Sequence, residues 1–284
     1  MTLPSHADSS LGPPKVDESP VPDRTRYWSA SEWNAMCDAI IADATSVAAL
    51  VDLAYLRKTG FREVQDFVNG RTGTAWEAVV AGAGAAASVD LNSYVPEGDA
   101  GLHVAFGAEL LTTGTTATGS AAIHLGAGRL FGAWKCGRVL YDAVVYIPDL
   151  SAGAQEFKLY AGLLDTIVAG VAPNYGLWFG YDRAVVGAKW YTSVIGEDGT
   201  FTDDSGITVA AAAWTRLSIV LSADSTTVLF YINDVLVNTE TGNTSFASYF
   251  GPGVVLNKTV GITARTVSVD LCAIDIALDT TTRR

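Results

Sequence analysis

Hydrophobic and polar positions alternate most clearly between Tyr175 and Asn238. Two runs there, AWTRLSIVLSAD and TTVLFYINDVLV, flank a turn at Ser222–Thr226 and place apolar residues at nearly every second position. Those positions are Trp214, Leu217, Ile219, Leu221, Val228, Phe230, Ile232 and Val235. A period of two with β-branched and aromatic residues is typical of half-buried antiparallel strands. This segment therefore predicts a β fold.

Strand-like runs continue over the rest of residues 91–284. They follow one another at short spacing with Gly, Asn, Asp and Ser at the turns, and we expect about eleven to thirteen of them. The pattern lacks the helical crossovers that join parallel strands. Antiparallel strands at such spacing form a sandwich or a barrel. The sequence thus predicts one large β domain over residues 91–284.

Residues 1–28 differ in composition and are rich in Pro, Ser and Asp. Their prolines fix the backbone torsion φ and remove backbone donors, which prevents regular structure. These prolines are Pro4, Pro13, Pro14, Pro20 and Pro22. We expect an extended arm, and no signal peptide, because an apolar central region is lacking.

Residues 29–60 are predicted to form one α-helix. Ser29 and Glu32 make a capping-box pattern, and Gly60 follows the last apolar position. Apolar residues step by four and three through about three heptads. The positions of this seam are Trp33, Cys37, Ile40, Ala44, Val47, Val51 and Ala54. We favour helix association between subunits, although the breadth of the apolar face also fits a helix packed on its own domain.

Residues 61–90 are expected to connect the helix to the β domain. The run GFREVQDFV predicts a short helix or strand. Turn signals at Asn69-Gly70 and Thr72-Gly73 predict a hairpin, and AGAGAAASVD has the small residues of a linker.

Charge is scarce for a chain of 284 residues, with 17% charged residues, 49% hydrophobic residues and a net charge of −12. Soluble monomers usually carry more charge, so either other chains cover much of the surface or the sandwich is rich in Ala, Gly and Thr. The negative charge argues against nucleic acid and anionic membranes as partners. No apolar run reaches the roughly 18 residues of a membrane-spanning helix.

The three cysteines, Cys37, Cys136 and Cys272, are odd in number and have no metal-ligand spacing. We expect buried free thiols in a chain made in a reducing cytoplasm. No cofactor is expected, because GAGAA at 82–86 lacks the strand–turn–helix context of a dinucleotide-binding loop.

Candidate catalytic residues are few. The three histidines, His6, His103 and His124, have no second ligand at metal-binding spacing. The chain has no Gly-x-Ser-x-Gly motif, and no mid-strand glutamate has a second acid two or four positions away. We therefore expect that the protein is not an enzyme.

Two further sets of residues have alternative explanations. An acidic loop offers oxygen ligands for Ca²⁺, although turn formation explains its composition more simply. Its acids are Glu197, Asp198, Asp203 and Asp204. Five aromatic residues fit either a sugar-stacking platform or the sandwich core, and we favour the core. They are Trp178, Trp190, Tyr191, Trp214 and Tyr231.

The chain resembles the concanavalin-like (laminin-G-like) jelly-roll domains of tailed-bacteriophage virion proteins over roughly residues 100–278. The resemblance rests on the runs YGLWFGYDR, KWYTSVIGEDGTFTDDSGITV, AWTRLSIVLSADSTTVLFYINDVLVNTE, TTGTTATGSAAIHLG and LFGAWKCGRVLYDAVVYIPDL. It implies a mainly β fold, an antiparallel jelly-roll β-sandwich, to which this chain adds the N-terminal extended arm and one α-helix.

The resemblance also implies a structural or adhesive role without catalytic residues. We expect a capsid decoration or head-fibre protein, made in the bacterial host cytoplasm and located in the virion, whose residues 1–60 anchor a projecting sandwich. A homotrimer is favoured, as in other phage fibres, with partners such as the major capsid protein or tail proteins. The alternative is a tail fibre, spike or adhesion module that binds a host surface glycan. A glycan depolymerase is the weaker alternative.

Overall fold

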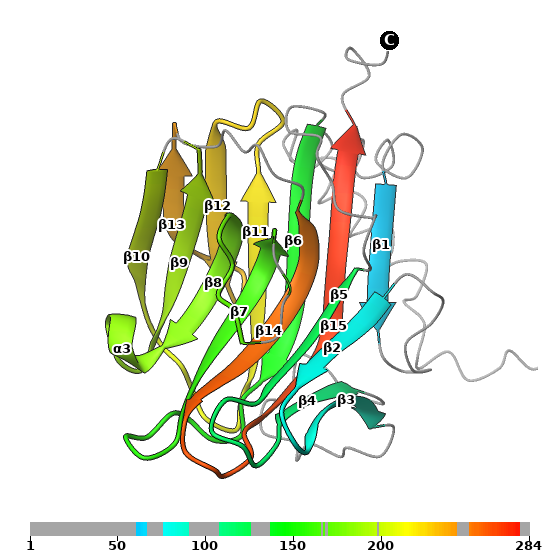
Figure 1. The fold of residues 1–284 in the computed structure, drawn as a ribbon. Helices are drawn as coiled ribbons and strands as arrows, with labels where there is room; N and C mark the ends of the chain where they lie inside the picture. The colour runs from blue at the N-terminus through cyan, green and yellow to red at the C-terminus, as the bar shows by residue number, and fades with distance from the viewer. Residues whose placement is uncertain are drawn as a thin grey trace, which may run out of the picture. The chain divides into compact units, whose positions relative to one another are not determined.

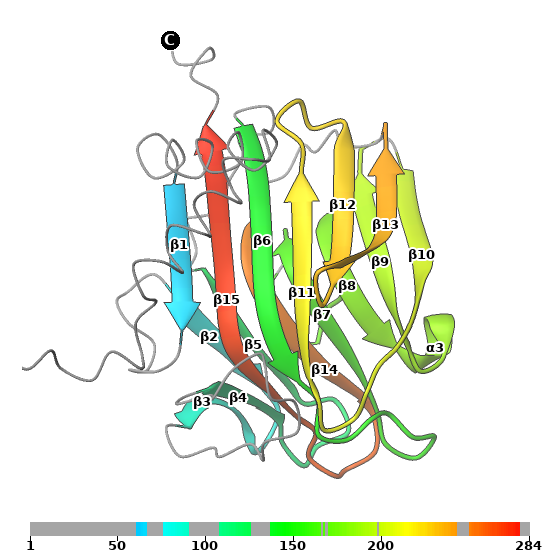
Figure 2. The ribbon, with the colours of Figure 1, turned by 180° about the vertical axis from the view of Figure 1, so that it is seen from behind.

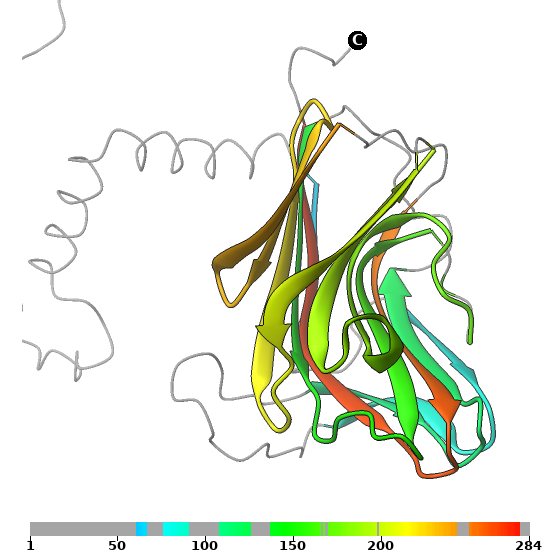
Figure 3. The same ribbon diagram turned by 90° about the vertical axis from the view of Figure 1, so that its left-hand side faces the viewer.

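Two antiparallel β-sheets pack face to face, as the edge-on view in Figure 3 shows. The structure is a computed structural model that describes residues 61–66, 76–90, 108–125, 137–165, 167, 170–197, 199–242 and 250–278. The expected arm at 1–28 and helix at 29–60 lie outside the described residues. The prediction of a mainly β, antiparallel sandwich of the jelly-roll type is confirmed.

Seven of the described strands form one sheet, which faces the viewer in Figure 1. They are β2 (Trp76–Ala81), β5 (Ser120–Leu125), β7 (Glu156–Leu164), β8 (Gly176–Asp182), β9 (Lys189–Gly196), β10 (Gly199–Thr208) and β14 (Gly251–Val260). Their order across the sheet is β10-β9-β8-β7-β14-β5-β2. The short helix α3 (Arg183–Val186) follows β8 directly.

Eight strands form the other sheet, which faces the viewer in Figure 2. They are β1 (Phe61–Asp66), β3 (Ala85–Asp90), β4 (Ala108–Thr113), β6 (Gly137–Tyr146), β11 (Trp214–Leu221), β12 (Thr227–Ile232), β13 (Val235–Thr241) and β15 (Thr266–Leu278). The order is β13-β12-β11-β6-β15-β4-β3. Because β15 is long, β4 pairs with its first residues and β1 with its last, on the side opposite β6.

Residues 61–90, expected to be a connector, supply β1, β2 and β3 to the two sheets. The run read as a small-residue linker contains the turn at 82–84 and the whole of β3. Alanines lack the strong strand preference that marks the other runs. The extended conformation of β3 therefore comes from its pairing with β4 and not from the strand propensity of its own residues.

The core lies between the sheets and is filled by alternate residues of each strand. On β11 the inward residues are Leu217, Ile219 and Leu221, as the alternation predicted. Trp214 and Val235 do not join them: Trp214 packs against Tyr146 at a ring-centroid distance of 5.2 Å, and Val235 is largely exposed. Both stand at the ends of their strands, where the period of two no longer determines burial.

The turns explain how these strands reverse. Asn233 and Asp234 connect β12 to β13 with φ of 49° and 64°, a conformation that Asn and Asp tolerate better than most residues. Between β11 and β12, the hydroxyl of Ser222 accepts hydrogen bonds from the backbone N–H groups of Thr226 and Thr227. The predicted turn at Ser222–Thr226 is thus confirmed.

Cys272 is buried in the core as a free thiol, as expected, and burial raises its pKa to about 12. Cys37 and Cys136 lie outside the described residues. Among the described residues, no helix has the length and apolar character that crossing a membrane requires.

Candidate functional site

A second hydrophobic cluster lies on the outer face of the seven-stranded sheet, away from the core. Its buried members are Ala122, Tyr160, Leu164, Trp178, Tyr191 and Val255. They alternate along their strands with core residues: Leu159, Ala161 and Leu163 point inward, whereas Tyr160 and Leu164 point outward. Outward positions of a sandwich are usually polar. A buried apolar cluster at such positions is therefore the first candidate for a site.

Three aromatic residues, Tyr160, Trp178 and Tyr191, form the centre of this cluster, and we call them the aromatic triad. Tyr160 and Trp178 pack edge to face with ring centroids 6.4 Å apart. Gly180 lies between Tyr160 and Tyr191 in the strand register. A Cβ atom at Gly180 would stand only 2.0 Å from the Cζ of Tyr191, so the ring of Tyr191 occupies the space that a side chain would need.

The indole N–H of Trp178 is buried and makes no hydrogen bond of good geometry among the described residues, although it lies near enough to the Tyr191 hydroxyl to interact with it. Only 4% of Trp178 is exposed, so bulk water does not solvate this donor freely. A buried donor without an acceptor costs about 1–3 kcal/mol. An oxygen atom of a ligand or of an ordered water that reached it would recover this energy.

Both phenols of the triad titrate above their ordinary range. Burial raises the pKa of Tyr160 to about 12, and the nearby charge of Asp182 adds to the effect. Burial also raises the pKa of Tyr191, the influence of Tyr160 raises it further, and the interaction of the Tyr191 hydroxyl with the Trp178 indole opposes the rise. Both hydroxyls therefore remain protonated at neutral pH, where they can donate and accept hydrogen bonds but are poor bases.

A polar row borders the triad. The strand register places Ser120, Asn257, Lys158 and Asp182 side by side across β5, β14, β7 and β8. Lys158 Nζ lies 2.7 Å from Asp182 Oδ2, and about a third of the lysine side chain is exposed. The other oxygen of Asp182 accepts a hydrogen bond from Ala184 N–H and so caps α3.

Asn257 connects this row to the segment between β7 and β8. Its side-chain oxygen accepts hydrogen bonds from the hydroxyl of Ser120 (2.5 Å) and the N–H of Gly170 (3.2 Å). Its side-chain nitrogen donates to the carbonyl of Val171 (3.1 Å). Three of the four hydrogen-bonding positions of this buried amide are thus engaged in structural contacts, so we interpret Asn257 as a support of the site.

The edge strand β10 lies next to Tyr191 on this outer face. Thr202 and Asp204 pair with Ser193 and Tyr191 and so share the outer face, where both are exposed. Ser193 Oγ and Thr202 Oγ1 lie 3.1 Å apart. Hydroxyl and carboxylate groups at this edge are therefore accessible to a ligand next to Tyr191.

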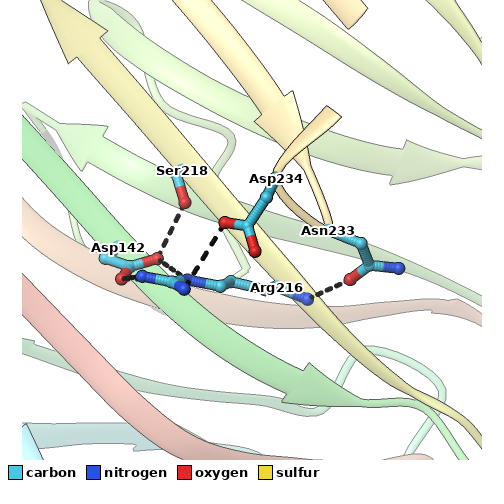
Figure 4. Close-up of polar contacts among 5 residues, drawn as sticks. All are labelled: Asp142, Arg216, Ser218, Asn233 and Asp234. Carbon is cyan, nitrogen blue, oxygen red and sulfur yellow. Dashed lines mark hydrogen bonds and ion pairs between the residues drawn. The ribbon is translucent and has the colours of Figure 1, made fainter. Parts of the chain in front are cut away.

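The opposite sheet carries a separate polar network on its own outer face (Figure 4). Arg216 Nε donates to both carboxylate oxygens of Asp142, at 3.0 and 3.1 Å, and Ser218 Oγ donates to Asp142 Oδ1 at 2.8 Å. The guanidinium also lies 3.4 Å from Asp234, and the backbone N–H of Arg216 donates to Asn233. The groups satisfy one another, so this network favours a structural role.

The structure separates the five aromatic residues singled out in the sequence. Trp190 lies in the core, whereas Trp178 and Tyr191 belong to the triad. Trp214 and Tyr231 are half-buried on the eight-stranded sheet. Three of the five are therefore buried in hydrophobic clusters, as expected, and of these only Trp190 lies between the two sheets.

The proposed Ca²⁺ ligands are not brought together among the described residues. Asp204 pairs with Lys189 and accepts a hydrogen bond from Gly206 N–H, and both contacts lower its pKa. Asp203 interacts instead with Asn238 on β13, and Asp198 lies outside the described residues. No group of three or more His, Cys, Asp or Glu in the described segments has the geometry of a metal site.

Of the three histidines, only His124 lies in the described part of the chain. His124 lies on β5, where its Nδ1–H donates to the Leu125 carbonyl at 2.9 Å. His6 and His103 lie outside the described residues, as does the whole helix seam from Trp33 to Ala54.

Sequence reasoning missed Tyr160, Lys158, Asp182 and Asn257 as site residues. Two signals pointed to them. In FKLYAGLLD, Lys158 and Tyr160 occupy the positions that alternate with core residues. Glycine within a strand, as at Gly180, often marks a close approach by another group.

Comparison with known proteins finds no matching family model and no matching curated protein. Solved structures do match. The endo-β-1,4-glucuronan lyase from the fungus Trichoderma reesei superposes with a TM-score of 0.52 over 76% of this chain and 95% of the lyase, at 14% identity. The Emp47p carbohydrate recognition domain gives a TM-score of 0.51 over 78% and 98%, at 8% identity.

The sandwich has a concanavalin-like jelly-roll fold. At such low identity the similarity concerns the fold alone, so the chemistry of the outer face has to be argued from its own residues.

Proposed function

We propose that this protein binds a glycan on the outer face of its seven-stranded sheet. The observation that carries this proposal is the aromatic triad with its unsatisfied Trp178 N–H. The triad is nearly fully buried, so it supports a sugar site as a floor and not as an exposed stacking face, and the polar groups beside it provide contacts for sugar hydroxyls. Two proteins of similar fold are named for carbohydrate, one as a glucuronan lyase and one as a carbohydrate recognition domain, which supports the proposal.

In this proposal the sugar lies against Tyr191 and the edge strand β10. The triad is nearly fully buried and forms the floor, whereas Thr202 and Asp204 offer exposed hydrogen-bonding groups beside it. A sugar oxygen that reaches the Trp178 N–H would remove the cost of a buried donor. Recognition then depends on the Trp178 N–H, on the exposed polar groups of β10 and on shape.

Glycan binding by the full-length chain, measured on a glycan array and then by calorimetry, tests this function. Trp178→Phe removes the N–H and should weaken binding by about tenfold, which corresponds to about 1.4 kcal/mol. Trp214→Phe, on the opposite sheet, is the matched control and should bind normally. An array without any bound glycan, or equal losses in both variants, would reject the proposal.

We propose a binding role in preference to catalysis. The phenols of the triad are held protonated, and the Lys158–Asp182 pair is committed to its own ion pair and to capping α3. Neither supplies a ready base. Release of reducing ends from a bound polysaccharide would instead support a glycan depolymerase.

We further propose that the sandwich is the projecting part of a tailed-bacteriophage virion protein, of the capsid decoration or head-fibre type. The resemblance of residues 100–278 to such domains and the low charge of the chain support this idea. Residues 1–60 would anchor the sandwich in the particle. A chain without residues 1–58 that still occupied particles fully would reject the anchoring role.

The oligomeric state follows from the same proposal. The heptad-like seam from Trp33 to Ala54 supports a homo-oligomer, with a trimer favoured. Light scattering on the purified full-length chain measures its mass directly, and a monomer at micromolar concentration would reject the trimer.

A further inference from the structure

The turn between β14 and β15 lies at one end of the sandwich (Figure 1). Lys258, a buried basic residue, is close to the end of β14 that precedes this turn. Its side chain passes inward from β14, and only 3% of the residue is exposed. The ammonium group donates to the carbonyl of Gly114 at 2.6 Å and to the carbonyl of Thr263 at 3.2 Å. Two neutral carbonyls satisfy hydrogen bonds but leave the charge uncompensated, which is costly away from water.

Arg265 brings a second cation to the same corner. Its backbone N–H donates to Thr113 Oγ1 at 3.0 Å, and its carbonyl accepts from Thr113 N–H at 2.9 Å. Thr113 directly precedes Gly114, the residue that holds the Lys258 ammonium. Both basic residues therefore converge on the start of the β4–β5 turn.

The guanidinium of Arg265 has more donors than acceptors here. One nitrogen reaches the carbonyl of Gln155 at 3.5 Å, a long contact, and Nε is buried with no acceptor at all. A guanidinium presents five N–H donors in a planar fork that matches carboxylate, sulfate and phosphate groups. The N–H groups of Arg265 that have no acceptor in the described structure could therefore donate to such an anion.

Neither cation forms an ion pair with a carboxylate of the described residues. Burial lowers the pKa of Lys258, and the charge of Arg265 lowers it further. An anion placed between these two basic groups would reduce their repulsion and favour the charged form of Lys258.

We propose that Lys258 and Arg265 form a binding site for an oxyanion, either a free inorganic ion or an acidic group carried by a sugar. Arg265, which is half-buried, makes the direct contact through its guanidinium group, and Lys258 adds a second positive charge nearby. The site shares no residue with the aromatic triad, so its test is independent of the test of the proposed glycan-binding face.

The backbone around Gly114 is tightly packed, so the test needs a variant that leaves it undisturbed. Gly114 has φ of +68°, and a Cβ atom there would stand 2.3 Å from the carbonyl oxygen of Ala83 in the β2–β3 turn. Removing the Lys258 ammonium would leave two buried carbonyls without donors, so Lys258 variants risk misfolding. Arg265→Gln removes the charge at a half-buried position and is the variant of choice.

Thermal unfolding of the full-length chain in sodium sulfate and in sodium chloride of equal ionic strength tests the proposal. With about 10 mM sulfate and millimolar affinity, the melting temperature should rise by about 3 °C more than in chloride. Sulfate also stabilises proteins generally through exclusion from their surfaces. The decisive quantity is therefore the sulfate-specific rise in melting temperature. We expect Arg265→Gln to lose this rise, whereas the control Arg138→Gln, at an exposed position on β6, should keep it.

Equal sulfate effects in all three proteins would overturn the site. The source of the anion is distinguished by repeating the measurement with phosphate, glucuronate and galactose 6-sulfate. A response to the inorganic ions as well as to the sugars shows that the free anion suffices. A response to the sugars alone shows that the acidic group must be part of a glycan.

Discussion

The hydroxyl of Tyr141 donates a 3.1 Å hydrogen bond to the carbonyl of Gly253 and thereby joins the two sheets through the core. Tyr141 belongs to β6 and is fully buried, so its hydroxyl needs this acceptor. Tyr141→Phe should lower the free energy of unfolding by about 1–2 kcal/mol. Urea denaturation of the purified chain measures the change.

Tyr231→Phe provides the control for this prediction. Tyr231 is half-buried on the outer face of β12, and no hydrogen bond of its hydroxyl is present among the described residues. Its replacement should change stability by less than about 0.5 kcal/mol. Equal effects of the two substitutions would show that the inter-sheet bond contributes nothing.

Most of the fold is predictable because burial on one face imposes a period of two. The runs that became β11 and β12 alternate cleanly, and all their expected residues except Trp214 lie in the core. The prediction fails where sequence carries no such signal. The alanines of β3 look like a linker, and only pairing with Leu110 and its neighbours on β4 makes them a strand.

Gly180 is predicted to be essential for the position of Tyr191. In Gly180→Ala the new Cβ would collide with the Tyr191 ring, so the ring must move, and stability should fall by about 1–3 kcal/mol. In a Tyr191→Ala background the same substitution should cost little, because the space is vacant. A double-mutant cycle by chemical denaturation measures this coupling.

Gly153→Ala is the matched control for Gly180. A Cβ atom at Gly153 would meet only Arg183 Nη1, at 3.8 Å, which is ordinary contact. A cycle without coupling between Gly180 and Tyr191 would show that the ring does not occupy the space above the glycine.

The candidate site was less predictable than the fold, for a physical reason. Trp178 and Trp190 stand in similar aromatic runs, yet one belongs to the outer cluster and the other to the core. Which face a strand residue occupies depends on strand register, and neighbouring strands set that register. The sequence around each tryptophan does not contain this information.

Asp142 is predicted to stabilise the eight-stranded sheet through Arg216 and Ser218. Asp142→Asn removes the charge that Arg216 meets through two oxygens, and it weakens the bond from Ser218. Because about a third of the Arg216 side chain is exposed, solvent screens part of the effect, and we expect a loss of about 1–2 kcal/mol.

The exposed pair of Asp204 and Lys189 is the control for this network. Asp204→Asn should leave the denaturation midpoint unchanged, since surface ion pairs contribute little. If Asp142→Asn were equally silent, the network in Figure 4 would have no role in stability.

The edge strands β10 and β13 meet through a pair of carboxyl groups that should make stability depend on pH. Asn238 Nδ2 donates to Glu240 at 3.0 Å and contacts Asp203 at 3.5 Å. Burial raises the pKa of Glu240, and its hydrogen bond with Asp203 raises it further. The folded chain therefore holds this proton more tightly than the unfolded chain, whose Glu pKa is about 4.3.

The contribution of this proton to the free energy of unfolding is complete below about pH 4. It is lost as the pH rises through the raised pKa of Glu240 in the folded state. Glu240→Gln keeps the acceptor for Asn238 without the charge. It should raise the melting temperature by about 1–3 °C at neutral pH and by nothing at low pH. Glu77→Gln, exposed on β2, should show no such trend. If Glu240→Gln raised the melting temperature more at low pH than at neutral pH, the prediction would be wrong.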